Sequence, residues 1–142
     1  MPAAIIAVKK DHVDIYVPEK SQELVVTYVQ EQRRTATVFE RDKAASANPY
    51  DVFFGGNHGL MQLDTAQSGK RLLVIKDSYA NCFLPFLIPY YKSITVVDPR
   101  YYYDDLDKLI EEQGIQEILF LYNANTFFSD DSLNEILKKE VK

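Results

Sequence analysis

Residues 70–81, with the sequence KRLLVIKDSYAN, place a serine directly after an apolar run. The run 72–75 is typical of a strand that is buried on both faces, and Lys76, Asp77 and Ser78 then form a polar turn before a predicted helix. In open α/β folds such a turn lies at the carboxyl edge of the sheet, where ligands bind. The free N–H groups of a helix start favour an anionic oxygen. Ser78 is therefore a candidate nucleophile; the alternative is that Ser78 or Asp77 only caps the helix.

Other polar clusters also follow predicted strands. Because the carboxyl ends of parallel strands share one rim, we expect three clusters to converge there: Lys76-Asp77-Ser78, Asp98-Pro99-Arg100 and Asn123-Ala124-Asn125. The turn Gly55-Gly56-Asn57-His58 also follows a predicted strand and could join them. An oxyanion formed beside Ser78 could be stabilised by the backbone N–H groups of Ser78, Tyr79 or Gly56 and by the Asn57 amide. The candidate oxyanion-stabilising or substrate-binding residues are Gly55, Gly56, Asn57, Asp77, Arg100 and Asn123.

His58 is a weak candidate for the general base, because nothing in the sequence orients it; the alternative is an ordinary loop histidine. Gly55 and Gly56 can equally serve only to permit positive φ in a turn. Arg100 can instead pair with a neighbouring carboxylate, Asp98 or Asp104. Two further residue sets have simpler interpretations: Tyr101–Tyr103 as a ligand wall or as packing, and Cys82 as inert core.

Strand-like patterns dominate the first part of the chain. Residues 12–17 and 35–40 alternate polar and apolar side chains, and 23–30 is rich in β-branched residues. The short connection between the last two predicts an antiparallel pair. We expect two further short strands, at 50–54 before the glycine-rich turn and at 60–63.

The second part alternates strands and helices. Strands are predicted at 71–75, 93–97 and 115–122, and helices at 79–91, 104–113 and 130–139, the first of them divided by two prolines. This order predicts parallel strands with right-handed crossovers. We therefore expect one α/β domain over 1–142, with a β-rich part at 10–63 that adds an antiparallel extension to a βαβαβα part at 70–142.

Composition excludes several classes. The 142 residues carry a formal net charge of −5, and the one dense basic spot, Arg33-Arg34, is too small for a nucleic-acid footprint. The single cysteine cannot form an internal disulfide. No window is long enough to span a membrane. The apolar start lacks the order of a secretory signal, so the chain as written would stay cytoplasmic. No metal-ligand spacing, phosphate loop or dinucleotide fingerprint is present, and we expect no metal and no cofactor.

The blocks YDVFFGGNHG, KRLLVIKDSYANCFLPFL, ITVVDPRYY and EILFLYNANTFF resemble the carboxyl-terminal half of DHHW-motif proteins over roughly residues 10–137. These are bacterial cell-envelope proteins similar to the SGNH-like acyltransferases of alginate O-acetylation. The resemblance implies a three-layer flavodoxin/SGNH-like fold, Ser78 at the nucleophile position and the Gly55–His58 turn near the active site. It also implies an acyl-ester or glycan substrate and a location in the cell envelope or outside the cell.

One departure from that family is plain. The Asp-His-His-Trp motif, which should lie upstream of Ser78 and supply the acid and base, is missing, and the chain has no tryptophan. Asp11-His12 matches only as a dipeptide. We therefore expect part of a domain, from a fragment or a naturally short reading frame, that is catalytically weak or inactive alone. An exposed apolar sheet face would follow, which a homodimer could cover.

The sequence thus favours the carboxyl-terminal portion of an SGNH-like serine esterase or O-acyltransferase that acts on cell-envelope glycans. The alternative is a non-catalytic carbohydrate-binding or assembly module of the cell envelope, with Tyr101–Tyr103 as its sugar-contacting surface. A flavodoxin-like domain that binds a phosphorylated ligand is disfavoured, because the turn 76–78 lacks glycines for close phosphate approach.

Overall fold

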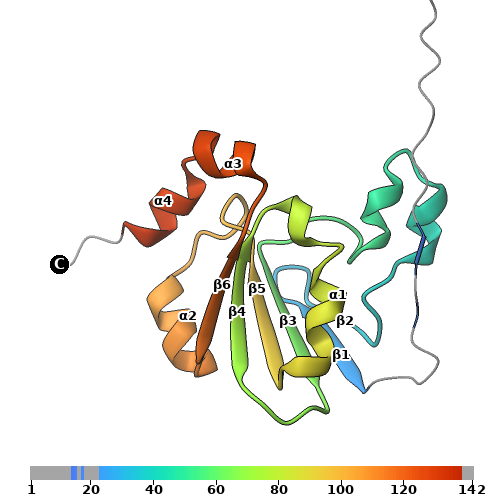
Figure 1. Ribbon diagram of the computed structural model, residues 1–142, viewed down its shortest axis with the longest axis horizontal. Coiled ribbons are helices and arrows are strands. Elements are labelled where there is room, and N and C mark those ends of the chain that lie inside the picture. The colour runs from blue at the N-terminus through green and yellow to red at the C-terminus, as the bar shows by residue number, and fades with distance from the viewer. Residues whose placement is uncertain (1–13, 16, 18–22, 139–142) are drawn as a thin grey trace, which may run out of the picture.

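The computed structural model describes residues 14–15, 17 and 23–138. Their strands form one six-stranded sheet in the order β2-β1-β3-β5-β4-β6 (Figure 1). Most of the strand predicted at 12–17 lies outside the described residues. The sheet is mixed, with an antiparallel half and a parallel half that pair directly with each other, so the chain has a mixed α/β fold.

The antiparallel half consists of β1 (Leu24–Tyr28), β2 (Arg33–Thr35) and β3 (Leu60–Thr65). Strand β1 pairs antiparallel with both of its neighbours, which confirms an antiparallel pair after the strand predicted at 23–30. The strand predicted at 35–40 was wrong, because β2, the partner of β1, ends at Thr35 and only Phe39 forms an isolated bridge beyond it. The β-branched run of β1 suits a pleated sheet with one covered face. The antiparallel half is continuous with the rest of the sheet, because β3 also pairs antiparallel with β5.

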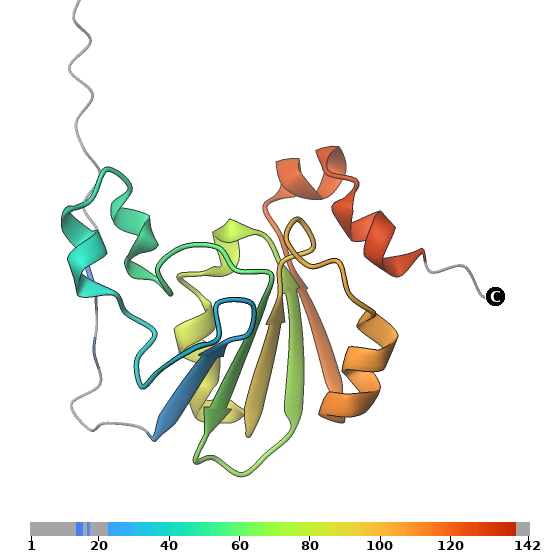
Figure 2. The same ribbon diagram turned by 180° about the vertical axis from the view of Figure 1, so that it is seen from behind.

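The parallel half consists of β4 (Arg71–Lys76), β5 (Ser93–Val97) and β6 (Glu117–Leu121). Strand β4 lies in the middle and pairs parallel with both of the others, as the alternating pattern predicted. Five of its six residues are buried, as expected for a central parallel strand. The three carboxyl ends meet at one rim of the sheet, the upper rim in Figure 2.

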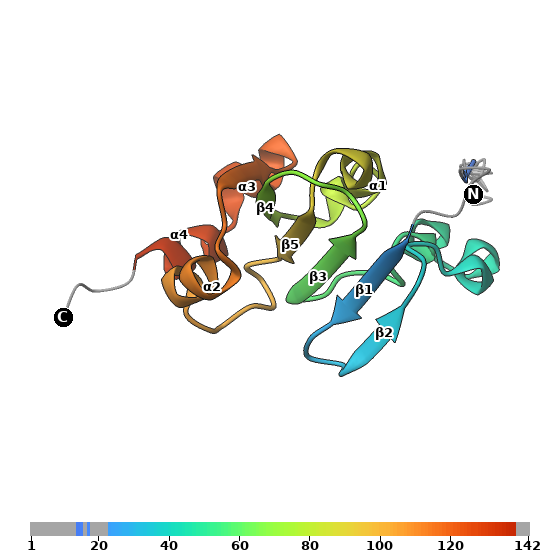
Figure 3. The same ribbon diagram turned by 90° about the horizontal axis from the view of Figure 1, so that it is seen from below.

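Helices cover both faces of the sheet (Figure 3). Helix α1 (Leu84–Leu87) packs with one core cluster, which includes Val74 of β4 and Val96 of β5. Helix α2 (Leu106–Gln113) packs with a second cluster on the opposite face. Helix α2 begins at the side-chain cap of Asp105 and ends at Gly114, whose φ of 58° permits the left-handed turn that stops it.

Two short helices follow β6, namely α3 (Ala124–Ser129) and α4 (Ser132–Leu137). The sequence predicted only the second. Helix α3 forms because the Asn123 side chain accepts a hydrogen bond from the Asn125 N–H group and so caps its start.

Two other predictions about local structure were also wrong. The strand predicted at 50–54 is largely a 3₁₀ helix, Pro49–Val52, which a proline starts with a suitable fixed φ. Cys82 is exposed, not part of the core. It lies between the elements into which the helix predicted at 79–91 is divided, namely a 3₁₀ turn at Ser78–Ala80, α1 and a second 3₁₀ turn at Ile88–Tyr90.

No helix among the described residues is both long and apolar enough to cross a membrane. Within the same residues, no group of histidine, cysteine or acidic side chains is arranged to hold a metal ion.

Candidate active site at the carboxyl rim of the parallel strands

The turn after β4 is tied down by Asp77. Its Oδ1 accepts a hydrogen bond from the Tyr79 N–H at 3.0 Å, and its Oδ2 accepts one from the Asn123 N–H at 3.1 Å. The carboxylate is only 2% exposed. Asp77 therefore caps the 3₁₀ turn and joins the end of β4 to the end of β6. The sequence left the identity of the cap open between two residues, and the structure assigns it to Asp77.

The Ser78 side chain does not cap the turn. Its side chain is half-buried, and among the described residues neither its hydroxyl nor its N–H has a hydrogen-bond partner. Its carbonyl is held instead, by the Tyr50 hydroxyl at 3.0 Å and by the Asn81 N–H at 3.2 Å. The backbone of the turn is thus fixed while its hydroxyl and N–H remain available to a ligand.

Tyr50 is a contributor that the sequence analysis missed. Its hydroxyl also lies 3.1 Å from the Tyr79 carbonyl and accepts a hydrogen bond from the Cys82 N–H at 3.1 Å. Burial, the largest influence, and the neighbouring Cys82 raise the pKa of this phenol, so it remains a neutral donor at physiological pH. Nothing in the local sequence signals this role, because Tyr50 lies 28 residues before the serine.

The glycine-rich turn passes through three consecutive positive φ angles. Phe54 has φ 63°, Gly55 has φ 80° and Gly56 has φ 124°. Only the glycines adopt this region without strain; Phe54 is held there with its ring fully buried. The Gly56 N–H closes the turn by donating to the Phe53 carbonyl at 3.2 Å. It is therefore already engaged, like the Tyr79 N–H, and neither is free to bind an oxyanion.

The turn delivers Asn57 to the rim. The side chain is exposed, and its Oδ1 accepts hydrogen bonds from the Asn81 amide at 3.1 Å and from the Lys76 ammonium at 3.4 Å. Its Nδ2 has no partner among the described residues. An unpaired Ser78 N–H and an unpaired Asn57 amide are the two donors that remain for an oxyanion.

His58 braces the turn. Its Nδ1 lies 2.6 Å from a Glu31 carboxylate oxygen, and its Nε2 lies 3.0 Å from the Phe54 carbonyl. The ring also packs edge-on against Tyr28, with the ring centroids 4.6 Å apart. Both nitrogens are thus engaged, and the arrangement gives His58 no free nitrogen with which to take a proton from Ser78.

A buried ionic cluster lies beneath the rim. The Lys76 Nζ is 3.2 Å from the Asp98 Oδ2, and both side chains are fully buried. Arg100 binds the same carboxylate through Nε at 2.9 Å and Nη2 at 2.7 Å. Burial lowers the pKa of Lys76, and Asp98 opposes that shift by stabilising the charged form. Hydrogen bonding to Asp98 raises the pKa of Arg100.

The four predicted polar clusters therefore come into contact at one rim. Asp77 joins the β4 turn to Asn123, and Lys76 joins it to Asp98 and Asn57. Several of the members have structural contacts: Arg100 neutralises Asp98, and the Asn123 side chain caps α3. The Ser78 hydroxyl and N–H and the Asn57 Nδ2 have no partner among the described residues, and the buried Asn81 Oδ1 also lacks one.

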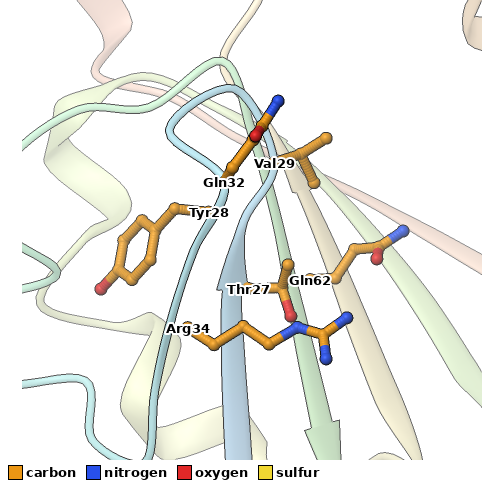
Figure 4. A pocket seen from close by; sticks show the side chains of 6 residues that line it. All are labelled: Thr27, Tyr28, Val29, Gln32, Arg34 and Gln62. Atoms are coloured by element: carbon orange, nitrogen blue, oxygen red, sulfur yellow. The ribbon is translucent and has the colours of Figure 1, made fainter.

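A hollow lies on the antiparallel half of the sheet (Figure 4). It is lined by Thr27, Tyr28, Val29, Gln32, Arg34 and Gln62. Thr27 pairs in register with both Arg34 and Gln62, and the Tyr28 ring points away from Arg34 and Gln62. The set holds no nucleophile beside a base, so its chemistry offers binding and not catalysis.

The fold and the rim define an α/β protein with a serine-bearing turn at the carboxyl edge of its parallel strands. The structure is similar to that of a DHHW family protein from Eubacterium siraeum DSM 15702, with a TM-score of 0.67 and 27% sequence identity. The similarity covers 79% of this chain and 39% of that protein. The resemblance to DHHW proteins stated from the sequence is thereby confirmed.

Two structures of Bacillus cereus PatB1 are also similar, each with a TM-score of 0.59. One of them carries a sulfonyl adduct; it is 25% identical, and the match covers 72% of this chain and 36% of PatB1. The other is 24% identical, with 72% of this chain and 35% of PatB1 covered. The chain thus spans well under half the length of these proteins. No protein-family model and no curated protein matches it.

Proposed function

We propose that this chain is the nucleophile-bearing portion of an SGNH-like serine esterase or O-acyltransferase, with a three-layer SGNH-like arrangement. The observation that carries the proposal is the Ser78 hydroxyl, which is unpaired in a turn whose backbone is held by Asp77, Tyr50 and Asn81. Two donors, the Ser78 N–H and the Asn57 Nδ2, are unpaired at the same rim. A fixed backbone with free reacting groups is the preorganisation that acyl transfer requires.

The proposed reaction proceeds through a covalent intermediate. The Ser78 Oγ attacks the acyl carbon of an ester, and its proton passes to a base. The Ser78 N–H and the Asn57 amide stabilise the oxyanion of the tetrahedral intermediate. The ester C–O bond then breaks, and the departing alcohol oxygen takes the proton. Water or an acceptor hydroxyl attacks the acyl-serine in turn, which releases an acid or a new ester and restores Ser78.

His58, the one histidine among the described residues, has both nitrogens engaged and does not supply the base. We propose that the base comes from a segment equivalent to the DHHW part of the relatives, most of whose length this chain does not span. The proposed substrate class, short acyl esters on cell-envelope glycans, follows from the family resemblance, as does the cell-envelope location.

The edge strand β6 is the proposed docking site of that segment. Ile118 and Phe120 are each 47% exposed, and in register they neighbour Leu73 and Ile75 of the buried strand β4. A further strand beside β6 would pair an open backbone edge and place its own side chains next to both of these residues. A concentration-dependent homodimer of this chain, measured by light scattering and lost in Phe120→Lys, would instead show that a second copy covers the edge.

A fluorophosphonate probe tests the nucleophile. The Ser78 oxygen would bond to phosphorus as fluoride leaves with the proton. We expect slow labelling of this chain, faster labelling of a chain extended upstream, no labelling of Ser78→Ala and unchanged labelling of Ser68→Ala, an exposed loop serine. Labelling of the extended chain alone would still support the proposal. Labelling that persists in Ser78→Ala, or that is absent from both lengths of chain, would refute it.

The carbohydrate-binding alternative has one supporting observation, the exposed rings of Tyr101 and Tyr103, 48% and 86% exposed beside Arg100. Tyr102 cannot contribute, because it is 2% exposed and its hydroxyl donates to the Asp105 carbonyl. Glycan binding that survives Ser78→Ala but is lost in Tyr101→Ala or Tyr103→Ala would favour this alternative.

A further inference from the structure

The Asn57 amide is held through its oxygen only. Its Oδ1 accepts from the Asn81 Nδ2 and from the Lys76 Nζ, while its own Nδ2 faces no partner among the described residues. Exposed asparagine side chains ordinarily sample several rotamers, so two hydrogen bonds from buried donors are an unusual restraint. Lys76 and Asn81 are 0% and 1% exposed, and so are themselves held by packing.

The direction of this network follows from its chemistry. A lysine ammonium donates and cannot accept, so the Asn57 atom that faces Lys76 is the oxygen. The Asn81 atom that faces this oxygen must then be its NH₂ group, which also donates to the Gly56 carbonyl at 3.3 Å. Asp98 holds the ammonium from the other side. The Asn57 Nδ2 is thus directed away from the network and toward solvent at the rim.

Asn81 also connects Asn57 with the serine. Its backbone N–H donates to the Ser78 carbonyl at 3.2 Å, while its side chain donates to Asn57. One residue therefore contacts both the turn that carries the nucleophile and the side chain that carries the free amide. Movement of one relative to the other would break one of these hydrogen bonds.

We propose that Lys76 and Asn81 are positioning residues that lock the Asn57 amide in the orientation of an oxyanion donor beside Ser78. The role of Asn57 as an oxyanion donor rests on the proposed function. The restraint of its side chain does not, because it is a property of the protein without substrate. A competing role is purely structural, in which the two side chains only fasten the turn 54–58 to β4. The two roles predict different behaviour of the Asn57 side chain and of Ser78 reactivity.

Side-chain ¹⁵N relaxation tests the locking directly. The Asn57 NH₂ resonance is identified by its loss in Asn57→Asp. We expect an order parameter near the rigid value of about 0.8 in the native chain, and a fall below about 0.6 in Asn81→Ser and in Lys76→Met. The exposed helical residue Asn134 serves as the control, with a mobile amide in every variant. A mobile Asn57 in the native chain, or a rigid one in both folded variants, would overturn the proposal.

Probe labelling of Ser78 tests the consequence for the oxyanion. We expect Asn57→Ala to slow fluorophosphonate labelling at least about tenfold, in line with the loss of an oxyanion donor. Asn81→Ser should slow it by a similar factor, and Asn57→Ala/Asn81→Ser should be no slower than Asn57→Ala alone, because both act through one amide. Independent, multiplying losses would assign Asn81 a purely structural role and overturn the proposal, whereas Asn134→Ala should leave the rate unchanged. If neither this chain nor the extended chain is labelled, the proposed function fails, while the relaxation experiment still decides the locking.

Discussion

Two adjacent regions meet at the rim: in one the polar groups are buried and paired, and in the other they are accessible and unpaired. Below it, Lys76, Asp77 and Asp98 are almost completely buried, and each has hydrogen-bond or ion-pair partners. Above it, the Ser78 hydroxyl and the Asn57 NH₂ group are accessible and unpaired among the described residues. The buried region supplies order and the accessible region is left free for chemistry, so stability and reactivity should respond to different substitutions.

The largest expected effect on stability is that of Asp98→Ala. It leaves the buried Lys76 ammonium without a countercharge and frees Arg100 from its carboxylate. We expect the free energy of unfolding to fall by about 3–5 kcal/mol in urea titrations. Lys76→Met should cost less, because Asp98 keeps Arg100, and the double variant Lys76→Met/Asp98→Ala should be more stable than Asp98→Ala alone. A loss below about 1 kcal/mol for Asp98→Ala would contradict the assignment of a buried ion pair.

Asp77→Ala should have the next largest effect. It removes the acceptor of two backbone N–H groups, those of Tyr79 and Asn123. We expect a loss of about 1–3 kcal/mol, together with slower labelling of Ser78 because the turn loses its cap. Asp77→Asn keeps one acceptor oxygen and should lie between the native chain and Asp77→Ala. Equal stability of all three proteins would argue against Asp77 as the cap.

Tyr50→Phe tests a residue that contacts both regions, because its hydroxyl holds the backbone of the turn that carries the unpaired Ser78 hydroxyl. The lost hydroxyl releases the carbonyls of Ser78 and Tyr79 and the N–H of Cys82. We expect a loss of about 1–2 kcal/mol in the free energy of unfolding and reduced labelling of Ser78. The matched control is Tyr90→Phe, since Tyr90 is 73% exposed. Native labelling in Tyr50→Phe would show that the turn does not depend on this hydroxyl.

Ser78→Ala and Asn57→Ala should barely change stability. Ser78→Ala removes only unpaired atoms, and Asn57→Ala removes an exposed acceptor, so we expect changes within about 0.5 kcal/mol for the first and about 1 kcal/mol for the second. Their effect should appear in probe labelling instead. Thermal or urea unfolding of both variants measures these changes. A fall of more than about 2 kcal/mol in the free energy of unfolding of Ser78→Ala would contradict the assignment of Ser78 to the unpaired, accessible region.

The smallest effect concerns acid stability at the Glu31–His58 contact. Burial acts to raise the pKa of Glu31, but hydrogen bonding to His58 and to its own backbone, with nearby positive charge, brings that pKa below its usual 4.5. A carboxyl whose pKa is lowered on folding stabilises the fold above the unfolded value and loses that contribution as pH falls through the folded value. The side chain is 42% exposed, so we expect less than about 1 kcal/mol. Glu31→Gln should flatten the stability curve below about pH 4.5.

Local sequence signals predicted much of the fold. The apolar run of β4, the β-branched β1 and the cap and glycine around α2 each encode their element within a few residues. The prediction failed at 49–52, where an apolar stretch folds as a 3₁₀ turn, and at α3, whose cap is a single asparagine. The placement of β3 between β1 and β5 was also beyond local reading, because strand pairing depends on distant partners.

For the candidate site, the serine after an apolar strand and the glycine-rich turn could be identified from residue types and from the resemblance. The roles of Tyr50, Lys76 and Asn81 could not, since their contacts join Tyr50 to a carbonyl 28 residues away and link Asn57 to residues 19 and 24 positions on. No spacing rule relates such positions.

The sequence by itself determined the three strands and the helix α2 of the parallel half and the convergence of the polar turns after those strands at one rim, because periodicity and helix caps are local properties. Only the tertiary structure decided which of those polar groups are engaged and which are free. It assigned the cap to Asp77, the two nitrogens of His58 to Glu31 and to the Phe54 carbonyl, and the Asn57 oxygen to Lys76 and Asn81. The physical reason is that a hydrogen bond forms only between groups that lie within about 3.5 Å of each other, and the tertiary fold decides which distant residues come that close.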